Sequence, residues 1–157
     1  MTRVLVAGIG NVFLGDDGFG VAVAERLERE RLPEGVRVAD FGVRSVHLAF
    51  ELMDPPELLI LVDATARGGP PGTLYVIDPS TDEELAVPAT PADAHAMSAS
   101  AVLAAVRWMN GTLPNARIVG CEPADLEEGM ELSAPVRAAV EPAITLIRRL
   151  LENEVCS

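Results

Sequence analysis

A short apolar run that opens onto a glycine-rich, acidic turn constrains this chain more than any other feature. Val4–Ala7 is apolar and rich in β-branched residues, which is typical of a strand buried on both faces of a parallel sheet. Glycine permits sharp turns and a close approach of the backbone to a ligand, and α/β proteins bind ligands at the carboxyl edge of such strands. The turn therefore predicts a binding site. Its polar and glycine residues, in order, are Gly8, Gly10, Asn11, Asp16 and Asp17.

The two acids in this turn favour a cation over a nucleotide. Gly8-x-Gly10 resembles the start of a dinucleotide-binding fingerprint, but Phe13 stands where the third glycine is required. Two carboxylates would also repel a pyrophosphate. Aspartate is common at helix N-caps, so we assign Asp16 to capping or to support of the turn, and Asp17 to the site itself.

The rest of the chain alternates apolar strand-like runs with amphipathic helical patterns. This alternation predicts an α/β fold: a three-layer α/β/α sandwich with a largely parallel, twisted sheet of about five strands. The loop from 63 to 72 is too short for a helical crossover, so the strand after it is expected to be antiparallel at one edge. Residues 1–157 are expected to form a single domain. The later predicted strands are Val36–Phe41, Leu58–Val62, Thr73–Ile77 and Arg117–Gly120.

Charge and composition narrow the possible partners. A formal net charge of −12 argues against nucleic acid and anionic membranes, because both require a basic surface. The chain has no long uncharged apolar stretch and no signal-peptide pattern, so a cytoplasmic location is expected. Cys121 and Cys156 form no Cys-x-x-Cys pair, and we interpret Cys121 as a small buried hydrophobe and Cys156 as a free thiol.

Three residues in different parts of the sequence are candidate metal ligands. Asp63 directly follows the most apolar predicted strand, and His95 precedes an alanine-rich helix. A doubly wound sheet can bring both into one crevice with Asp17. Two carboxylates and one imidazole suit zinc, nickel or iron(II), and three ligands leave a position open, as in catalytic sites. A lone histidine is more often packed or solvated than a ligand, and His47 lies inside a predicted helix and is the weaker candidate.

Several motifs together resemble the endopeptidases that mature nickel–iron hydrogenases by trimming the carboxyl terminus of the large subunit. The similarity covers nearly the whole chain. The motifs are Gly8-x-Gly10-Asn11, Asp16-Asp17-Gly18-x-Gly20-Val21, Leu61-Val62-Asp63-Ala64, Asp93-Ala94-His95, Val119-Gly120-x-Glu122-Pro123 and Val140-Glu141-Pro142-Ala143.

The resemblance implies roles for particular residues. The family's metal-binding residues, which we take as catalytic, fall on Asp17, Asp63 and His95. The implied metal is nickel, carried by the precursor of the hydrogenase large subunit, and zinc or cadmium can substitute in vitro. The family's substrate-selecting loop often reads Asp-Gly-Gly-Thr, whereas this chain departs from it, so the particular hydrogenase served is not specified. The substrate-binding residues are then Asp40, Phe41, Gly42, Val43 and Arg44, with Gly8, Gly10, Asn11 and Asp16 as the supporting loop.

Two mechanisms and one competing function stay open at this point. A bound ion could polarise the scissile carbonyl or activate a water molecule, or the acids could act directly as a general base. The competing function is a non-catalytic nickel-binding chaperone or carrier for the same precursor. The absence of a histidine-rich or cysteine-rich tract argues against a dedicated carrier.

Overall fold

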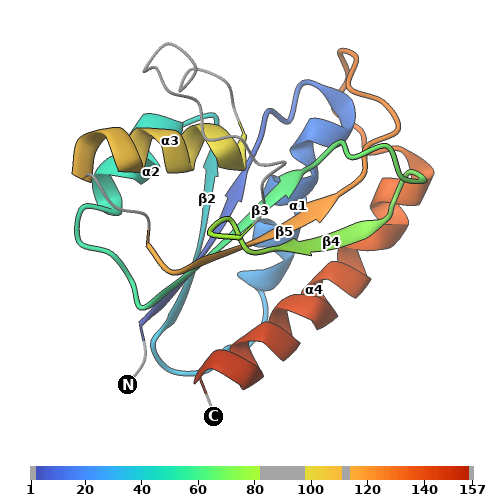
Figure 1. The fold of residues 1–157 in the computed structure, drawn as a ribbon. Coiled ribbons are helices and arrows are strands. Elements are labelled where there is room, and N and C mark those ends of the chain that lie inside the picture. The colour runs from blue at the N-terminus through green and yellow to red at the C-terminus, as the bar shows by residue number, and fades with distance from the viewer. Residues whose placement is uncertain (1–2, 82–97, 111–113, 156–157) are drawn as a thin grey trace.

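A five-stranded sheet forms the centre of the protein (Figure 1). The computed structural model describes residues 3–81, 98–110 and 114–155. The strand order is β2-β1-β3-β5-β4, with parallel pairing throughout except that β4 runs antiparallel to β5 at the edge. The predicted mixed sheet, including its antiparallel edge strand, is therefore confirmed. The strands are β1 Val4–Ile9, β2 Val36–Gly42, β3 Leu58–Ala64, β4 Leu74–Ile77 and β5 Ala116–Cys121.

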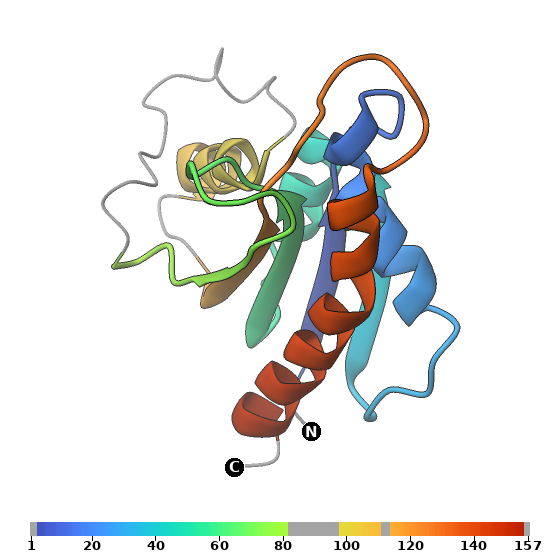
Figure 2. The same cartoon turned by 90° about the vertical axis from the view of Figure 1, so that its right-hand side faces the viewer.

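Helices cover both faces of this sheet, as the two views show (Figures 1 and 2). One face packs against α2 and α3, and the other packs against α1 and α4. A short 3-10 turn, η1, connects β1 to α1. The predicted three-layer arrangement is confirmed. The helical elements are η1 Gly15–Gly18, α1 Phe19–Leu27, α2 Ser45–Glu51, α3 Ala99–Asn110 and α4 Ala134–Val155.

The central strands are apolar on both faces because each face lies under a helical layer. In β1, Leu5 and Ala7 pack towards α2 and α3, while Val4 and Val6 pack towards α1 and α4. Residues 58–62 of β3 are all buried. This double burial explains the uninterrupted apolar runs in the sequence. Within the described ranges, no helix is both long and apolar enough to cross a membrane.

Helix α1 lies unusually close to the sheet because residue 20 is a glycine. A Cβ atom on Gly20 would overlap the carbonyl oxygens of Val62 in β3 and Ile9 in β1. Helix propensity alone would favour alanine here by about 1 kcal/mol. The close packing allows no such atom, so the start of α1 is held directly over the carboxyl ends of β1 and β3.

We expect Gly20→Ala to destabilise the protein by about 1–3 kcal/mol, because overpacking against backbone outweighs the gain in helix propensity. Urea unfolding measures the effect. The control is Ala22→Gly in the same helix, at a half-buried position, where only the propensity loss of about 1 kcal/mol is expected. A Gly20→Ala protein at least as stable as the wild type would contradict the close packing.

Candidate functional site

Two aspartates approach each other where β1 and β3 end, at the carboxyl edge of the sheet. Asp63 is the second-last residue of β3 and is 3% exposed. Its Oδ2 accepts a hydrogen bond of 3.0 Å from the backbone N–H of Ala99, at the start of α3. Its Oδ1 has no partner, and among the described residues it is the one buried side-chain oxygen or nitrogen in that condition. A buried unsatisfied polar atom costs about 1–3 kcal/mol, so this oxygen is suited to an external ligand.

Burial raises the pKa of Asp63 well above its usual value. The hydrogen bond from Ala99 N–H lowers this pKa, and the nearby charge of Asp17 raises it. Asp17 lies in η1 and is half-buried. Its Oδ2 accepts a 2.8 Å hydrogen bond from the N–H of Asn11, and burial raises its pKa as well. Two interacting carboxyls that both resist ionisation would be stabilised by a cation between them. The structure thus brings together two of the three predicted ligands.

Two other buried acids differ from this pair because their oxygens are satisfied. Asp16 is fully buried, and Glu122 is 6% exposed. Glu122 Oε1 accepts hydrogen bonds from the N–H groups of Arg67 and Gly69 and from the Tyr75 hydroxyl, at 2.8, 3.1 and 2.7 Å. Burial raises the pKa of Glu122, but these bonds outweigh it and the net shift is downward. Glu122 is therefore an ionised anchor for the loop after β3.

Asp16 has the same kind of role for a different loop. Its Oδ2 accepts from Ala124 N–H, Asp125 N–H and the Ser133 hydroxyl, and its Oδ1 accepts from Ser133 N–H, at distances of 2.7–2.9 Å. Burial raises the pKa of Asp16, but the four bonds together lower it. Of the two roles predicted for Asp16, helix capping is wrong, because neither η1 nor α1 has a side-chain cap. Asp16 instead ties residues 124–133 to the turn.

The glycines and Asn11 of the supporting loop set the path of this turn. Gly10 has a φ of +131°, and a Cβ there would overlap the carbonyl oxygen of Asp17. Gly8 lies equally close to the carbonyl of Gly20. Asn11 closes the turn with its own Oδ1, which accepts a 2.9 Å hydrogen bond from the N–H of Phe13. The turn is thus compact enough to place Asp17 above the end of β1.

A cleft of about 390 Å³ lies beside this turn and is lined by the predicted substrate-binding segment, residues 40–44, and by residues 10–13. Arg44 forms part of its wall: Nη2 donates to the carbonyl of Asp40 at 2.7 Å, and the guanidinium lies 5.6 Å from the Phe41 ring centre. Gly42 turns the chain with a φ of +52°. Phe41 itself is buried in the core, whereas Val43 is half exposed. The segment therefore borders the cleft, and Phe41 anchors it to the core.

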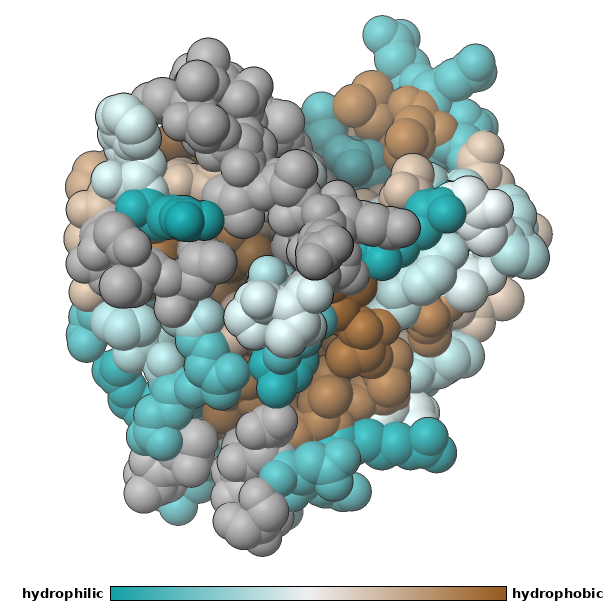
Figure 3. Space-filling model, in the orientation of Figure 1, coloured by the Kyte–Doolittle hydropathy of each residue, from teal (hydrophilic) through white to brown (hydrophobic). Residues whose placement is uncertain are grey.

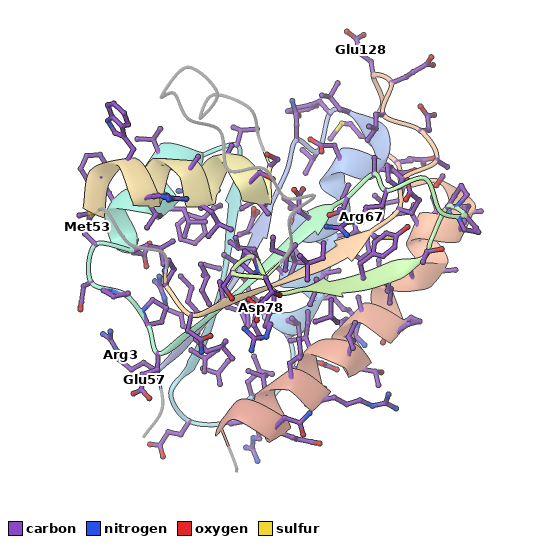
Figure 4. All side chains as sticks on the ribbon, in the orientation of Figure 1. Arg3, Met53, Glu57, Arg67, Asp78 and Glu128 are labelled. Atoms are coloured by element: carbon purple, nitrogen blue, oxygen red, sulfur yellow. The ribbon has the colours of Figure 1, made fainter. Side chains whose placement is uncertain are left out.

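A second cavity, of about 290 Å³, reaches Asp63 from the side of α3. Thr65, Arg67, Ser98 and Ser100 contribute to its lining. None of these four residues was predicted to belong to the site. Two signals in the sequence place these residues at this edge of the sheet. One is the apolar run before Asp63, and the other is the cap position of Ser98, whose Oγ accepts a 3.2 Å hydrogen bond from the N–H of Ala101. Figure 4 shows the Arg67 side chain at this end of the sheet.

The third predicted ligand, His95, lies outside the described residues. Across residues 3–81, 98–110 and 114–155, no three histidine, cysteine or acidic side chains are grouped to hold a metal ion. His47 is exposed on α2, with its ring 6.1 Å from that of Phe41. Cys121 is buried and burial raises its pKa to about 11, which fits an inert apolar role, and Cys156 lies outside the described residues.

The comparison with known proteins adds an independent line of evidence. The family model described as hydrogenase maturation protease matches residues 21–150. The chain is 37% identical over 148 residues to the hydrogenase expression/formation protein HupM of Azotobacter chroococcum, covering 92% of this chain and 69% of that protein. It is 31% identical over 153 residues to the hydrogenase 2 maturation protease of Escherichia coli, covering 96% and 92%.

The fold agrees with that of solved members. The structure matches the hydrogenase maturating endopeptidase HybD from Escherichia coli with a TM-score of 0.77 and 31% identity, covering 98% of this chain and 94% of the other. The sequence similarity and the agreement in fold both extend over most of the chain. The chain therefore belongs to the hydrogenase maturation protease family.

Proposed function

We propose that this protein is an endopeptidase that removes a carboxyl-terminal peptide from the nickel-loaded precursor of a nickel–iron hydrogenase large subunit, in the cytoplasm. Membership of the hydrogenase maturation protease family supports peptide hydrolysis as the reaction class. The observation that carries the site assignment is the unsatisfied Oδ1 of buried Asp63, beside the half-buried carboxyl of Asp17. Because burial raises the pKa of both carboxyls, a cation bound between them would favour their ionised forms.

The residues fit a metal ion by the chemistry of their donor atoms. Asp63 Oδ1 and Asp17 Oδ1 have no hydrogen bond among the described contacts, while the Oδ2 atom of each is held by a backbone N–H. With His95 they would form an oxygen and nitrogen set that accepts nickel brought by the precursor, with zinc or cadmium as substitutes in vitro. Bound there, the ion would polarise the scissile carbonyl or lower the pKa of a water molecule.

The protein itself orients the two carboxylates through backbone hydrogen bonds. The N–H of Ala99 holds Asp63 from α3, and the N–H of Asn11 holds Asp17 from the turn. Both carboxylates are thus fixed before a substrate arrives, which reduces the reorganisation that binding requires. The cleft between residues 10–13 and 40–44 would receive the precursor segment next to Asp17. The exposed Val43 and Arg44 would contact that segment and select among precursors.

The test is incubation of wild-type protein with a purified nickel-loaded large-subunit precursor, followed by intact mass measurement. We expect the precursor to lose the mass of a carboxyl-terminal peptide, and we expect no loss with Asp17→Asn or His95→Ala. Circular dichroism checks that both variants are folded. A precursor isolated without nickel should stay uncleaved. Nickel transfer without any change in the mass of the precursor would instead identify a carrier.

A further inference from the structure

An exposed apolar surface adjoins the cleft and is not used by the site described above. It consists of residues 124–131 together with Phe13, and we name it the outer lobe. Figures 1 and 2 show residues 124–131 lying beside the segment between β1 and α1 in both views. Phe13, Leu126 and Met130 are 61%, 49% and 71% exposed. Figure 3 shows apolar surface beside hydrophilic atoms in this part of the molecule, and Figure 4 places Glu128 at its tip.

The outer lobe is held firmly although its side chains are exposed. Asp16 accepts hydrogen bonds from Ala124 and Asp125 at the first end of residues 124–131, and from Ser133 just beyond the last. Backbone bonds add to this: Gly129 N–H donates to the carbonyl of Phe13 at 2.9 Å, and Gly15 N–H donates to the carbonyl of Gly129 at 2.8 Å. A surface that is already ordered loses little conformational entropy when a partner binds. The exposure of three large apolar side chains on such a rigid segment is a feature of interaction sites.

The charge of the outer lobe indicates the chemistry of the partner. Four exposed acids surround its apolar side chains: Asp125, Glu127, Glu128 and Glu131. The sequence contains no lysine or arginine between Arg117 and Arg137. An apolar centre with a charged rim is the usual anatomy of a protein interface, and a rim of one sign favours a partner of the opposite sign. A basic segment with an apolar side chain fits this surface.

We propose that the outer lobe docks a segment of the hydrogenase precursor that presents an apolar side chain flanked by lysine or arginine. This inference rests on the proposed function. Continuity supports the choice of occupant, because Phe13 lines the cleft and is also part of the outer lobe, where its carbonyl accepts the hydrogen bond from Gly129 N–H. The cleft and the outer lobe are therefore adjoining surfaces, which one precursor segment can contact together. The lobe adds affinity for the precursor without contact to the reacting atoms.

Two lobe variants test the proposal: Glu127→Lys/Glu128→Lys/Glu131→Lys, and Leu126→Ser/Met130→Ser. The matched control is Glu25→Lys/Glu28→Lys/Glu34→Lys, which makes the same change of net charge at exposed acids elsewhere. With the nickel-loaded precursor, each lobe variant should raise KM at least about tenfold with little change in kcat, as expected for lost uniform binding. The wild-type KM should rise with salt, and the KM of the charge variant should rise much less. The control should keep the wild-type KM to within about twofold.

Further measurements separate the possible failures. Calorimetry measures the affinity for the precursor independently of cleavage, so a wild type that binds but does not cleave overturns the proposed function and leaves docking measurable. Unchanged affinity and KM in both lobe variants overturn the docking proposal alone. An equal loss in the control also overturns it, because the effect is then one of overall charge. A wild-type dimer that the lobe variants convert to a monomer assigns the surface to a second copy of the chain, which likewise overturns the proposal.

Discussion

Replacing Asp63 with asparagine should abolish precursor cleavage while leaving the metal-free protein at least as stable as the wild type. The carboxylate is buried with an unsatisfied oxygen, and such an atom costs about 1–3 kcal/mol. A neutral amide of the same shape removes the charge and can keep the bond from Ala99 N–H to its oxygen. Loss of a group that only orients a metal ligand lowers metal affinity or activity by about 10–100-fold. Loss of a ligand itself should therefore reduce the cleavage rate at least about a hundredfold.

The pH dependence of stability gives a second readout for Asp63. The folded-state pKa of Asp63 lies well above its unfolded value of 3.8. The folded metal-free protein therefore binds the proton more tightly, and this contribution to stability is full below pH 3.8 and is lost as the pH rises through the folded-state pKa. Asparagine removes this dependence. The free energy of unfolding of Asp63→Asn, relative to wild type, should increase from acid towards neutral pH in buffers with a chelator.

The control for this experiment is Asp54→Asn, which changes the same atoms at an exposed carboxylate on the opposite edge of the sheet. It should retain wild-type cleavage and stability within about 0.5 kcal/mol. Cadmium or zinc should raise the melting temperature of the wild type and of the control but not that of Asp63→Asn, because only a protein that binds the ion is stabilised by it. Cleavage at the wild-type rate by Asp63→Asn would remove this residue from the site.

The fold could be predicted because its strongest determinants are local in the sequence. Residues 58–62 are apolar on both faces because helices cover both sides of β3, and that burial leaves an uninterrupted pattern. The short 63–72 connection could not contain a helix, which indicated the antiparallel edge strand that β4 forms. Asp17 and Asp63 could be placed at one edge of the sheet for the same reason, since each comes after a recognisable strand. Their role as metal ligands, like that of His95, stays a prediction.

The supporting anchors could not be predicted because their contacts are distant in the sequence. Asp16 binds residues more than a hundred positions away, and nothing near it distinguishes this role from helix capping. Glu122 similarly holds Arg67 and Gly69, 55 and 53 positions away. The sequence shows that these acids lie near strand ends. Only the three-dimensional structure shows that the buried carboxylates of Asp16 and Glu122 accept hydrogen bonds, whereas Asp63 Oδ1 accepts none.

Replacing Asp16 with asparagine should be among the most destabilising single changes in this chain, although Asp16 is not a metal ligand. Its carboxylate accepts four hydrogen bonds, three of them from backbone N–H groups. An asparagine NH₂ would face some of these donors and leave them buried without an acceptor. Hydrogen bonds to charged groups contribute about 1.5–3 kcal/mol each, so the loss of two should cost about 3–6 kcal/mol.

The effect of Asp16→Asn should depend on pH in the opposite sense to that of Asp63→Asn. The folded-state pKa of Asp16 lies below its unfolded value of 3.8, so its contribution to stability is full above that pH and is lost as the pH falls through the folded-state pKa. Urea unfolding should therefore show a large loss of stability for Asp16→Asn at pH 7, and this loss should become smaller below about pH 4.

The control is Asp125→Asn, an exposed acid in the loop that Asp16 holds, with an expected change in stability of at most about 1 kcal/mol. In the folded fraction, metal binding should weaken and precursor KM should rise, because the turn bearing Asp17 and the outer lobe lose their common attachment. A fully stable Asp16→Asn protein would show that backbone contacts alone hold residues 124–133 in place.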